Sequence, residues 1–321
     1  MLRLALLLIA PGLAAAQVPR VGVIEVYGLR KVPAERVLEA LGVAEGDRLP
    51  SSKLDVEERL AQLSGVSEAR LEAVCCSAGR AILYIGIGER GGRTFRVRKA
   101  PAGAEVLPDD TVGPYREFLE AFEEAARAGN TAEDDSEGHP LAAEPNVRRL
   151  QERFRAIIPH RISILRRVLR DSADPLHRAI AAAMIGYAPN KQEVAEDLED
   201  ALRDPDEGVR ANALRALAAM SARPEVRLRV SAIVEMLDSI AWSDRYRAAE
   251  ALVALTSRRP AAVADLKEAG AALREMARWK TPAHARPAFL MLGRMAGLPE
   301  EAIEEAWETD PDSLLKRFGS R

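Results

Sequence analysis

The sequence predicts two folded parts of different class: a small α+β domain near the N-terminus and an all-α helical-repeat solenoid after it. Between Val21 and Glu89, alternating apolar runs flank two amphipathic segments, as in a small mixed sheet with helices. From about residue 162, Ala and Leu recur at helical spacing in four similar copies. Aromatic residues make up only 4% of the chain, which favours long helices over a β-sandwich. We predict a signal peptide at 1–16, the α+β domain at 17–90, a linker with one helix and an acidic loop at 91–146, and the solenoid at 147–321.

The first sixteen residues have the features of a secretory signal peptide. Arg3 gives a basic start, an apolar run follows to Leu13, and three small residues end at Ala16. The run is shorter than the ~20 residues that span a bilayer and contains Pro11; a buried N-terminal helix is the alternative. No Cys follows the cleavage point, which argues against a lipid anchor. We expect cleavage near Ala16 and an exported chain, periplasmic or secreted, without a transmembrane segment.

The predicted α+β domain has the order strand, helix, helix, strand, strand, which requires a three-stranded sheet with both helices on one face. "VGVIEVYG" alternates in polarity and predicts a half-buried first strand, with Ile24 and Val26 on one face and Tyr27 on the other. "EARLEAVCC" and "RAILYIGIGE" predict the last two strands, joined by a tight turn at 77–79. The apolar stripes of the two helices are Val37, Leu38 and Leu41, and Leu54, Leu60 and Leu63.

The last strand contains Gly86, Gly88 and Gly91 at the spacing of a dinucleotide-binding fingerprint. That fingerprint requires a helix to begin at the glycines and to cross back to a parallel strand. The following "GRTFRVRKAPAGAEVLP" contains glycines, prolines and β-branched residues instead. We therefore expect no nucleotide site and no cofactor.

Residues from Val21 to about Glu89 resemble a POTRA (polypeptide-transport-associated) domain. The resemblance rests on "IEVYG", "VPAERVLEALGVAEGDRL", "LDVEERLAQLSGV" and a last strand that ends in Glu89. Such modules occur in outer-membrane barrel assembly, secretion and envelope division proteins. The resemblance implies partner binding by strand addition at an exposed sheet edge, which uses backbone groups and leaves no side-chain signature. The chain departs from the pattern in having one such unit and no barrel sequence after it.

Cys75 and Cys76 are the chain's two cysteines, and they are adjacent. Neighbouring side chains of a strand point to opposite faces, so the pattern predicts one buried and one exposed thiol. A vicinal disulfide in a strained turn and pairing between molecules in an oxidising compartment are the alternatives. The sequence leaves the redox state open.

The predicted linker begins with a Gly-, Arg- and Pro-rich stretch in which 94–97 could form a short strand. "YREFLEAFEEAARAG" predicts a helix, and the acidic stretch 130–146 lacks periodicity. The next segment, 147–170, carries eight Arg and one Glu. We interpret it as the solvated face of a helical array, because the acidic stretch can neutralise it and Pro159 interrupts its apolar stripe; a membrane surface or nucleic acid is the alternative. The net charge of −3 argues against nucleic acid.

The predicted solenoid repeats a helical hairpin in which an Arg lies early in each second helix. The copies are "DPLHRAIAAAMIGYA", "DEGVRANALRALAAM", "SDRYRAAEALVALTS" and "TPAHARPAFLMLGRM", with markers Arg178, Arg210, Arg245 and Arg286. They resemble HEAT repeats, including the subset related to phycobilin-lyase repeats. "ALRDPDEGVRANALRALAAM" is the best copy, with Asp204-Pro205 at its turn, and the copy with Pro287 would act as a terminal cap. Apolar faces are predicted at Val194, Leu198, Ala201 and Leu202; Val209, Ala213, Ala216 and Leu217; and Ala248, Ala251, Leu252 and Leu255.

Motifs for chemistry are sparse. His139, His160, His177 and His284 lack metal-ligand spacing, and we expect them to be solvated or capping. No nucleophile elbow or phosphate-binding loop is present. Trp242, Trp279 and Trp307 are predicted packing anchors, although one could be a binding hot spot. We therefore predict no catalytic, cofactor-binding or metal-binding residue, and the sequence does not identify the protein-binding residues.

These expectations favour a non-enzymatic, exported adaptor of a bacterial cell envelope. Its POTRA-like domain would dock to a membrane or envelope protein, and its repeats would bind a second protein. Two alternatives remain: a bilin lyase-like enzyme that uses the repeats as a catalytic groove, and a soluble peptide-binding regulator that uses the repeats alone. The identity of the partner and the oligomeric state are not predicted.

Overall fold

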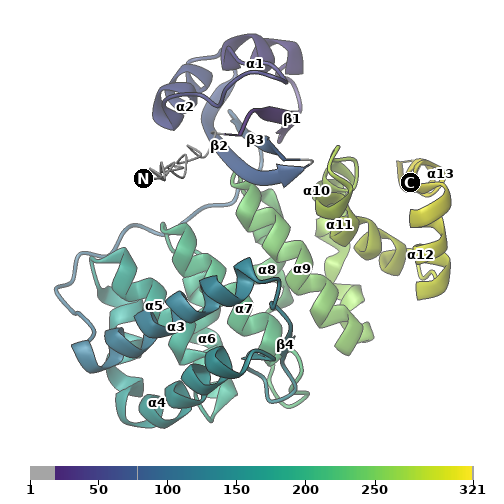
Figure 1. The fold of residues 1–321 in the computed structure, drawn as a ribbon. Helices are drawn as coiled ribbons and strands as arrows, with labels where there is room; N and C mark the ends of the chain where they lie inside the picture. Colours follow the sequence, from purple (N-terminus) through teal and green to yellow (C-terminus); the bar gives the residue numbers. More distant parts are fainter. Residues whose placement is uncertain (1–18, 78, 320–321) are drawn as a thin grey trace, which may run out of the picture.

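The structure is a computed structural model that describes residues 19–77 and 79–319, so the predicted signal peptide lies outside the described residues. A small three-stranded mixed sheet with two helices lies above a helical repeat-like region (Figure 1). We call these parts the N-terminal unit (residues 21–89) and the repeat region (residues 145–319). In the described part of the chain, no helix combines the length and the apolar character that crossing a membrane requires.

The N-terminal unit has the predicted order: β1 (Val21–Tyr27), α1 (Ala34–Leu41), α2 (Lys53–Ala61), β2 (Val66–Ser77) and β3 (Arg80–Glu89). The sheet order is β1-β3-β2, with β1 parallel and β2 antiparallel to β3. A three-stranded sheet is therefore confirmed. Strands β1 and β2 form its two edges, and β3 lies between them.

The two helices cover one face of this sheet, as predicted. Val37 and Leu41 of α1, and Val56 and Leu60 of α2, are buried in one core with apolar residues of the sheet. Leu38 and Leu54 were expected in the same stripes, but their exposed fractions are 41% and 62%. Successive side chains of an α-helix are rotated by about 100° around the helix axis. Leu54 therefore lies about 200° from the buried Val56 and points away from the sheet.

The second face of the sheet is buried as well, so the prediction of a half-buried first strand is wrong. Tyr27 and Tyr84 are each 1% exposed and belong to the core of the repeat region, not to that of α1 and α2. Alternation shows that the two faces differ in polarity. It does not show that a tyrosine-bearing face is covered by a distant part of the chain.

The repeat region consists of helical hairpins whose second helices lie side by side (Figure 1). The first helices are α4 (Pro145–Asp171), α6 (Lys191–Ala201), α8 (Val230–Glu235) with the 3-10 helix η1 (Met236–Asp238), and α10 (Gly270–Met276), which follows η2 (Pro260–Ala269). The second helices are α5 (Pro175–Ile185), α7 (Glu207–Met220), α9 (Trp242–Arg258) and α11 (Pro282–Met295). Helices α12 (Glu300–Thr309) and α13 (Pro311–Gly319) follow, and α12 packs on α11.

The predicted helix faces are confirmed, because all twelve of their residues are at most 4% exposed. The expected break at Pro159 is wrong: α4 continues through this residue as one helix of 27 residues. Pro159 is exposed, whereas Ile158 and Leu165 on either side of it are buried. The buried face therefore compensates for the one hydrogen bond that proline cannot donate.

The linker also differs from expectation. The helix is confirmed as α3 (Asp109–Arg127), which packs on α4. No strand forms at 94–97. The acidic stretch contains a short hairpin, in which β4 (Glu133–Asp134) pairs with β5 (Leu141–Ala142). We call residues 133–142 the acidic hairpin.

Three of the marker arginines are buried and form ion pairs between successive hairpins. Arg178 pairs with Asp204 at 2.8 Å, Arg210 with Asp244 at 2.8 Å, and Arg245 with Glu275 at 2.6 Å. Each guanidinium also donates to a backbone carbonyl in the turn of its own hairpin, those of Ser172, Asp204 and Ser239 respectively. Arg286 differs, because it is exposed and pairs with Glu304 of α12. We call the three ion pairs of the buried arginines the arginine ladder.

The segment between the sheet and α3, residues 93–107, runs along the turns of the hairpins in reverse order. The Phe95 amide donates to the Asp238 carbonyl, the Arg98 amide to the Arg203 carbonyl, and the Gly103 amide to the Asp171 carbonyl. The Arg98 side chain adds an ion pair of 2.7 Å with Asp204. Burial alone would raise the pKa of Asp204, but hydrogen bonds from Arg178 and Arg98 hold it below its ordinary value. We call residues 93–107 the connecting segment.

Replacing Arg210 by Met tests the ladder. The change leaves the carboxylate of Asp244, 3% exposed, without its guanidinium, so we expect the free energy of unfolding to fall by about 3–5 kcal/mol. Urea denaturation of the full chain measures it. The matched control is Arg127→Met, which removes an exposed pair with Glu123 and should cost less than about 1 kcal/mol. Equal losses for the two variants would contradict the structural role of the ladder.

Candidate functional site

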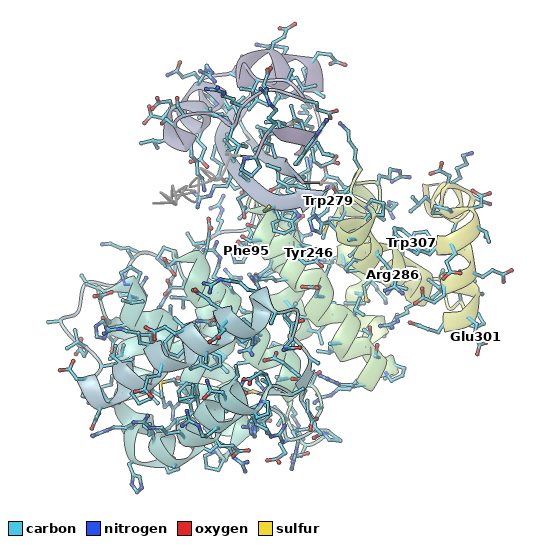
Figure 2. The ribbon with its side chains drawn as sticks, in the orientation of Figure 1. Phe95, Tyr246, Trp279, Arg286, Glu301 and Trp307 are labelled. Atoms are coloured by element: carbon cyan, nitrogen blue, oxygen red, sulfur yellow. The ribbon has the colours of Figure 1, made fainter. Side chains whose placement is uncertain are left out.

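The N-terminal unit meets the repeat region at an aromatic interface, which we call the seam. Tyr84 of β3 stacks on Trp242 of α9 with ring centroids 4.8 Å apart, and Trp242 stacks on Tyr246 at 5.1 Å. The Tyr84 hydroxyl lies 2.5 Å from Nδ1 of His284 in α11. Trp279 packs against Tyr27 and Tyr84 and lies below the sheet in Figure 2. Aromatic burial of this kind gives the seam a large apolar area.

Polar contacts fix the orientation of the two parts at the seam. The Tyr27 hydroxyl donates to the Ile240 carbonyl at 2.6 Å, and the Gly28 amide donates to Glu275 at 2.8 Å. Glu275 also accepts from Arg245, whose guanidinium lies 4.6 Å from the centre of the Tyr27 ring. The last pair of the arginine ladder is therefore part of the seam.

The seam explains the glycines that resemble a dinucleotide fingerprint. A Cβ on Gly86 would lie 1.9 Å from the carbonyl oxygen of Ile240, so only glycine allows the turn before α9 to approach β3. A Cβ on Gly88 would meet the Glu68 side chain, and Gly91 has a φ of +74° in the turn after β3. No helix begins at these glycines. Their spacing serves strand packing and a turn.

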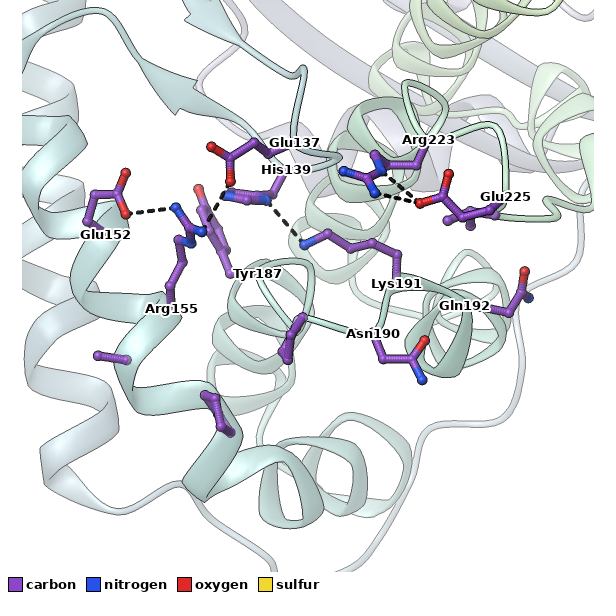
Figure 3. Close-up of a pocket in the computed structure, with 14 residues that line it drawn as sticks. Glu137, His139, Glu152, Arg155, Tyr187, Asn190, Lys191, Gln192, Arg223 and Glu225 are labelled. Atoms are coloured by element: carbon purple, nitrogen blue, oxygen red, sulfur yellow. Dashed lines mark hydrogen bonds and ion pairs between the residues drawn. The ribbon is translucent and has the colours of Figure 1, made fainter.

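A cavity of about 790 Å³ lies between the acidic hairpin and the repeats (Figure 3). His139 of the hairpin and Lys191 at the start of α6 are 3% and 7% exposed. Lys191 Nζ donates to the carbonyls of Gly186 and Ala188, each at 2.8 Å, and to Nδ1 of His139 at 3.2 Å. These three acceptors use all the hydrogens of the ammonium group. Lys191 thereby ties the hairpin to the α5–α6 turn.

Burial and positive neighbours shape the electrostatics of this cavity. Burial, together with Lys191 and Arg155, lowers the pKa of His139 to about 4. Burial, with Arg155 and Arg223, lowers the pKa of Lys191 to about 8. His139 is therefore neutral at pH 7, with its proton on Nε2, because Nδ1 accepts from Lys191. Nε2 is buried and has no hydrogen-bond partner among the described residues.

The rim of the cavity is neutralised within the chain. Arg155 pairs with Glu137 and Glu152, and Arg223 pairs with Glu225. The acidic hairpin thus does contact the basic helix, through Glu137. Its other two ion pairs reach further along the repeats, from Glu133 to Arg215 of α7 and from Asp135 to Arg258 of α9. Among the described residues that line the cavity, both arginines are paired with glutamates, and the ammonium group of Lys191 already donates to two carbonyls and to His139.

The histidines differ from the expectation that all four are solvated or capping. His160 is exposed, as expected. His139 is buried in the cavity, His177 accepts the Leu107 amide of the connecting segment at 2.8 Å, and His284 is half-buried in the seam. These three roles arise from contacts with residues far away in the chain, which no local spacing indicates. In the described part of the chain, no cluster of His, Cys, Asp or Glu has the size to hold a metal ion.

The aromatic and cysteine predictions have different outcomes. Trp242 and Trp279 pack in the seam, and Trp307 packs on Phe289 with ring centroids 5.0 Å apart, so their role as packing anchors is confirmed. The expectation of two separate thiols is wrong, because Cys75 is disulfide-bonded. Strand alternation does not apply there, since the register of β2 and β3 shifts between Val74 and Ser77. Ala78 of the predicted turn lies outside the described residues.

Comparison with protein families identifies the repeats. Residues 162–253 match the model of HEAT repeats. The match begins within α4 and ends within α9, so it includes the first two pairs of the arginine ladder. No curated protein matches the chain. HEAT repeats commonly mediate protein binding.

Gly86→Ala tests the close approach at the seam. The added methyl must displace the Ile240 carbonyl, so we expect a loss of about 2–4 kcal/mol in the free energy of unfolding. Urea denaturation measures this loss. Gly113→Ala is the control, because its Cβ has open space inside α3 and should leave stability unchanged or raise it slightly. A Gly86→Ala variant as stable as the original chain would contradict the seam.

His139 predicts a loss of stability in acid. Its pKa of about 4 in the folded state is below the ordinary value of about 6.5, so between these values the unfolded state alone binds the proton. Lowering the pH from 7 to 4.5 should therefore remove about 2 kcal/mol through this group. His139→Asn should reduce the loss measured by urea denaturation at the two pH values, whereas the exposed control His160→Asn should not. Equal pH dependence in all three proteins would contradict the assignment.

Proposed function

We propose that the protein is an exported, non-catalytic adaptor of a bacterial cell envelope. In this proposal the N-terminal unit is a POTRA-like domain that docks to a membrane or envelope protein, and the HEAT repeats form a solenoid that binds a second protein. The observation that carries the proposal is the seam, because its hydrogen bonds and ring contacts fix the orientation of the three-stranded N-terminal unit on the repeat region. Such an arrangement would let one protein hold two partners in a defined relative position.

The edges of the sheet support docking through β2. The first edge, β1, is already occupied: the Val21 amide donates to the Asp47 carbonyl, and Lys280 donates to the Ile24 carbonyl. At the other edge, the outward Leu71 amide of β2 donates to a side chain, that of Glu57. Backbone groups that point outward alternate along a strand, so Ala73 faces the same edge as Leu71. Strand addition at β2 requires a partner strand to displace Glu57 or to begin beyond it.

The surface of the repeats supports a second partner at α9. Helix α3 and the acidic hairpin contact α7 and the C-terminal end of α9 through Asn212, Arg215 and Arg258. Nearer to the seam, Arg247 and Glu250 of α9 are exposed. HEAT repeats bind proteins along such faces. We therefore place the second partner on the exposed part of α9.

Site-specific photo-crosslinking in a diderm bacterium that expresses the full chain tests the proposal. A photoreactive residue replaces Ala73 at the β2 edge, Arg247 on α9, or Arg36 on the exposed side of α1 as the control. We expect a chain processed near Ala16 in the periplasmic fraction, with different protein adducts at positions 73 and 247 and none at position 36. An unprocessed cytoplasmic chain, or no specific adduct at either position, would overturn the adaptor proposal.

A further inference from the structure

A second cleft, of about 360 Å³, opens where the N-terminal unit meets the repeats. We call it the seam cleft. Its lining comes from the turn after β1, the end of β3 and the turn after it, η1 and the turn before α9, Arg245 of α9, and α10 with the turn that follows it. Five arginines contribute to this lining: Arg30, Arg93, Arg245, Arg274 and Arg278. This concentration of positive charge contrasts with the net charge of −3 for the whole chain.

The three carboxylates in the same lining are already engaged. Glu89 accepts the backbone amides of Arg30, Lys31 and Val32, at 2.7–2.8 Å through Oε1. Burial alone would raise its pKa, but these three amides hold the pKa below its ordinary value. Asp238 pairs with Arg93 at 2.7 Å. Glu275 accepts from Arg245 and from the Gly28 amide. None of the three forms an ion pair with Arg30, Arg274 or Arg278.

Three guanidinium groups of the seam cleft therefore lack a carboxylate partner. Among residues 19–77 and 79–319, no ion pair involves Arg30, Arg274 or Arg278, and Arg278 donates only to the Arg274 carbonyl one turn earlier. Arg30 and Arg278 are exposed, and Arg274 is half-buried. In the cavity below the acidic hairpin, by contrast, Arg155 and Arg223 are both paired with glutamates. The seam cleft is the one of these two cavities that has an excess of positive charge.

We propose that the seam cleft binds a short acidic peptide segment, with its carboxylates on Arg30, Arg274 and Arg278. A guanidinium group presents paired N–H donors that match a carboxylate, so three guanidinium groups around one cleft favour a ligand with two or three carboxylates. Ala271 and Ala272 are small and leave the cleft open between the arginines. Its lining contains no aromatic side chain on which a base could stack, which favours a peptide over single-stranded nucleic acid.

The ligand would contact both parts of the protein at once. Arg30 belongs to the N-terminal unit, whereas Arg274 lies in α10 of the repeat region and Arg278 in the turn that follows α10. The proposal rests on the proposed function in one respect, since it describes the partner as a protein with an acidic segment. The binding itself depends on the seam cleft alone.

Fluorescence anisotropy with a fluorescein-labelled hexaglutamate peptide and the purified full chain tests this inference. We expect Arg274→Glu/Arg278→Glu to weaken binding at least tenfold, and Arg30→Glu to weaken it at least threefold. The matched control, Arg36→Glu/Arg116→Glu, makes the same change in net charge at exposed arginines outside the cleft and should stay within twofold. Because the contacts are ionic, affinity should fall as NaCl rises from 50 to 300 mM.

Three outcomes would overturn the inference: no measurable binding of the peptide, equal weakening by the cleft and control variants, or tighter binding of inorganic tripolyphosphate that depends on the same arginines. The last outcome would assign the cleft to phosphate. These results are independent of the crosslinking experiment, which reports export and contacts in the cell. Peptide binding without adducts in the cell would keep the site and reject the adaptor, and the reverse result would reject the site alone.

Discussion

The arginine ladder is the interaction on which the other contacts of the molecule depend. Burying a guanidinium group without hydrogen-bond partners costs free energy. Two groups of acceptors satisfy each of Arg178, Arg210 and Arg245. One group is the backbone carbonyls in the turn of its own hairpin, and the other is a carboxylate of the next hairpin. Each hairpin therefore needs its neighbour in register before its arginine is satisfied. This coupling makes neighbouring hairpins stabilise one another, as in other stacked repeats.

The two ends of the ladder also hold the parts of the chain that are not repeats. Asp204, in the first pair, also forms an ion pair with Arg98, which fixes the connecting segment against the repeats. Glu275, in the last pair, also accepts a hydrogen bond from the Gly28 amide, which fixes the N-terminal unit against the repeats. The seam then adds aromatic packing around Tyr27 and Tyr84. As a result, the β2 edge, the exposed part of α9 and the seam cleft have fixed positions relative to one another.

The candidate sites could be predicted from the sequence only in part. The marker arginines stand out because they recur at similar positions in four copies, but the sequence does not show that three are buried and the fourth exposed. The fourth differs because α12 follows α11, and Glu304 reaches Arg286 at the surface. His139, His177 and His284 carry no sequence signal, since their partners lie 52, 70 and 200 residues away. The arginines of the seam cleft are likewise spread over four segments of the chain.

The sequence by itself determined the order of the elements, the three-stranded sheet and the buried faces of the repeats, because these follow from local periodicity and from glycine and proline at element ends. Only the tertiary structure decided what covers the second face of the sheet and why Gly86 must be glycine. It also decided that α4 continues through Pro159 and that the acidic hairpin forms ion pairs with α7 and α9 as well as with α4. Each of these features depends on a contact between segments distant in sequence, and neither propensity nor periodicity carries information about which segments meet.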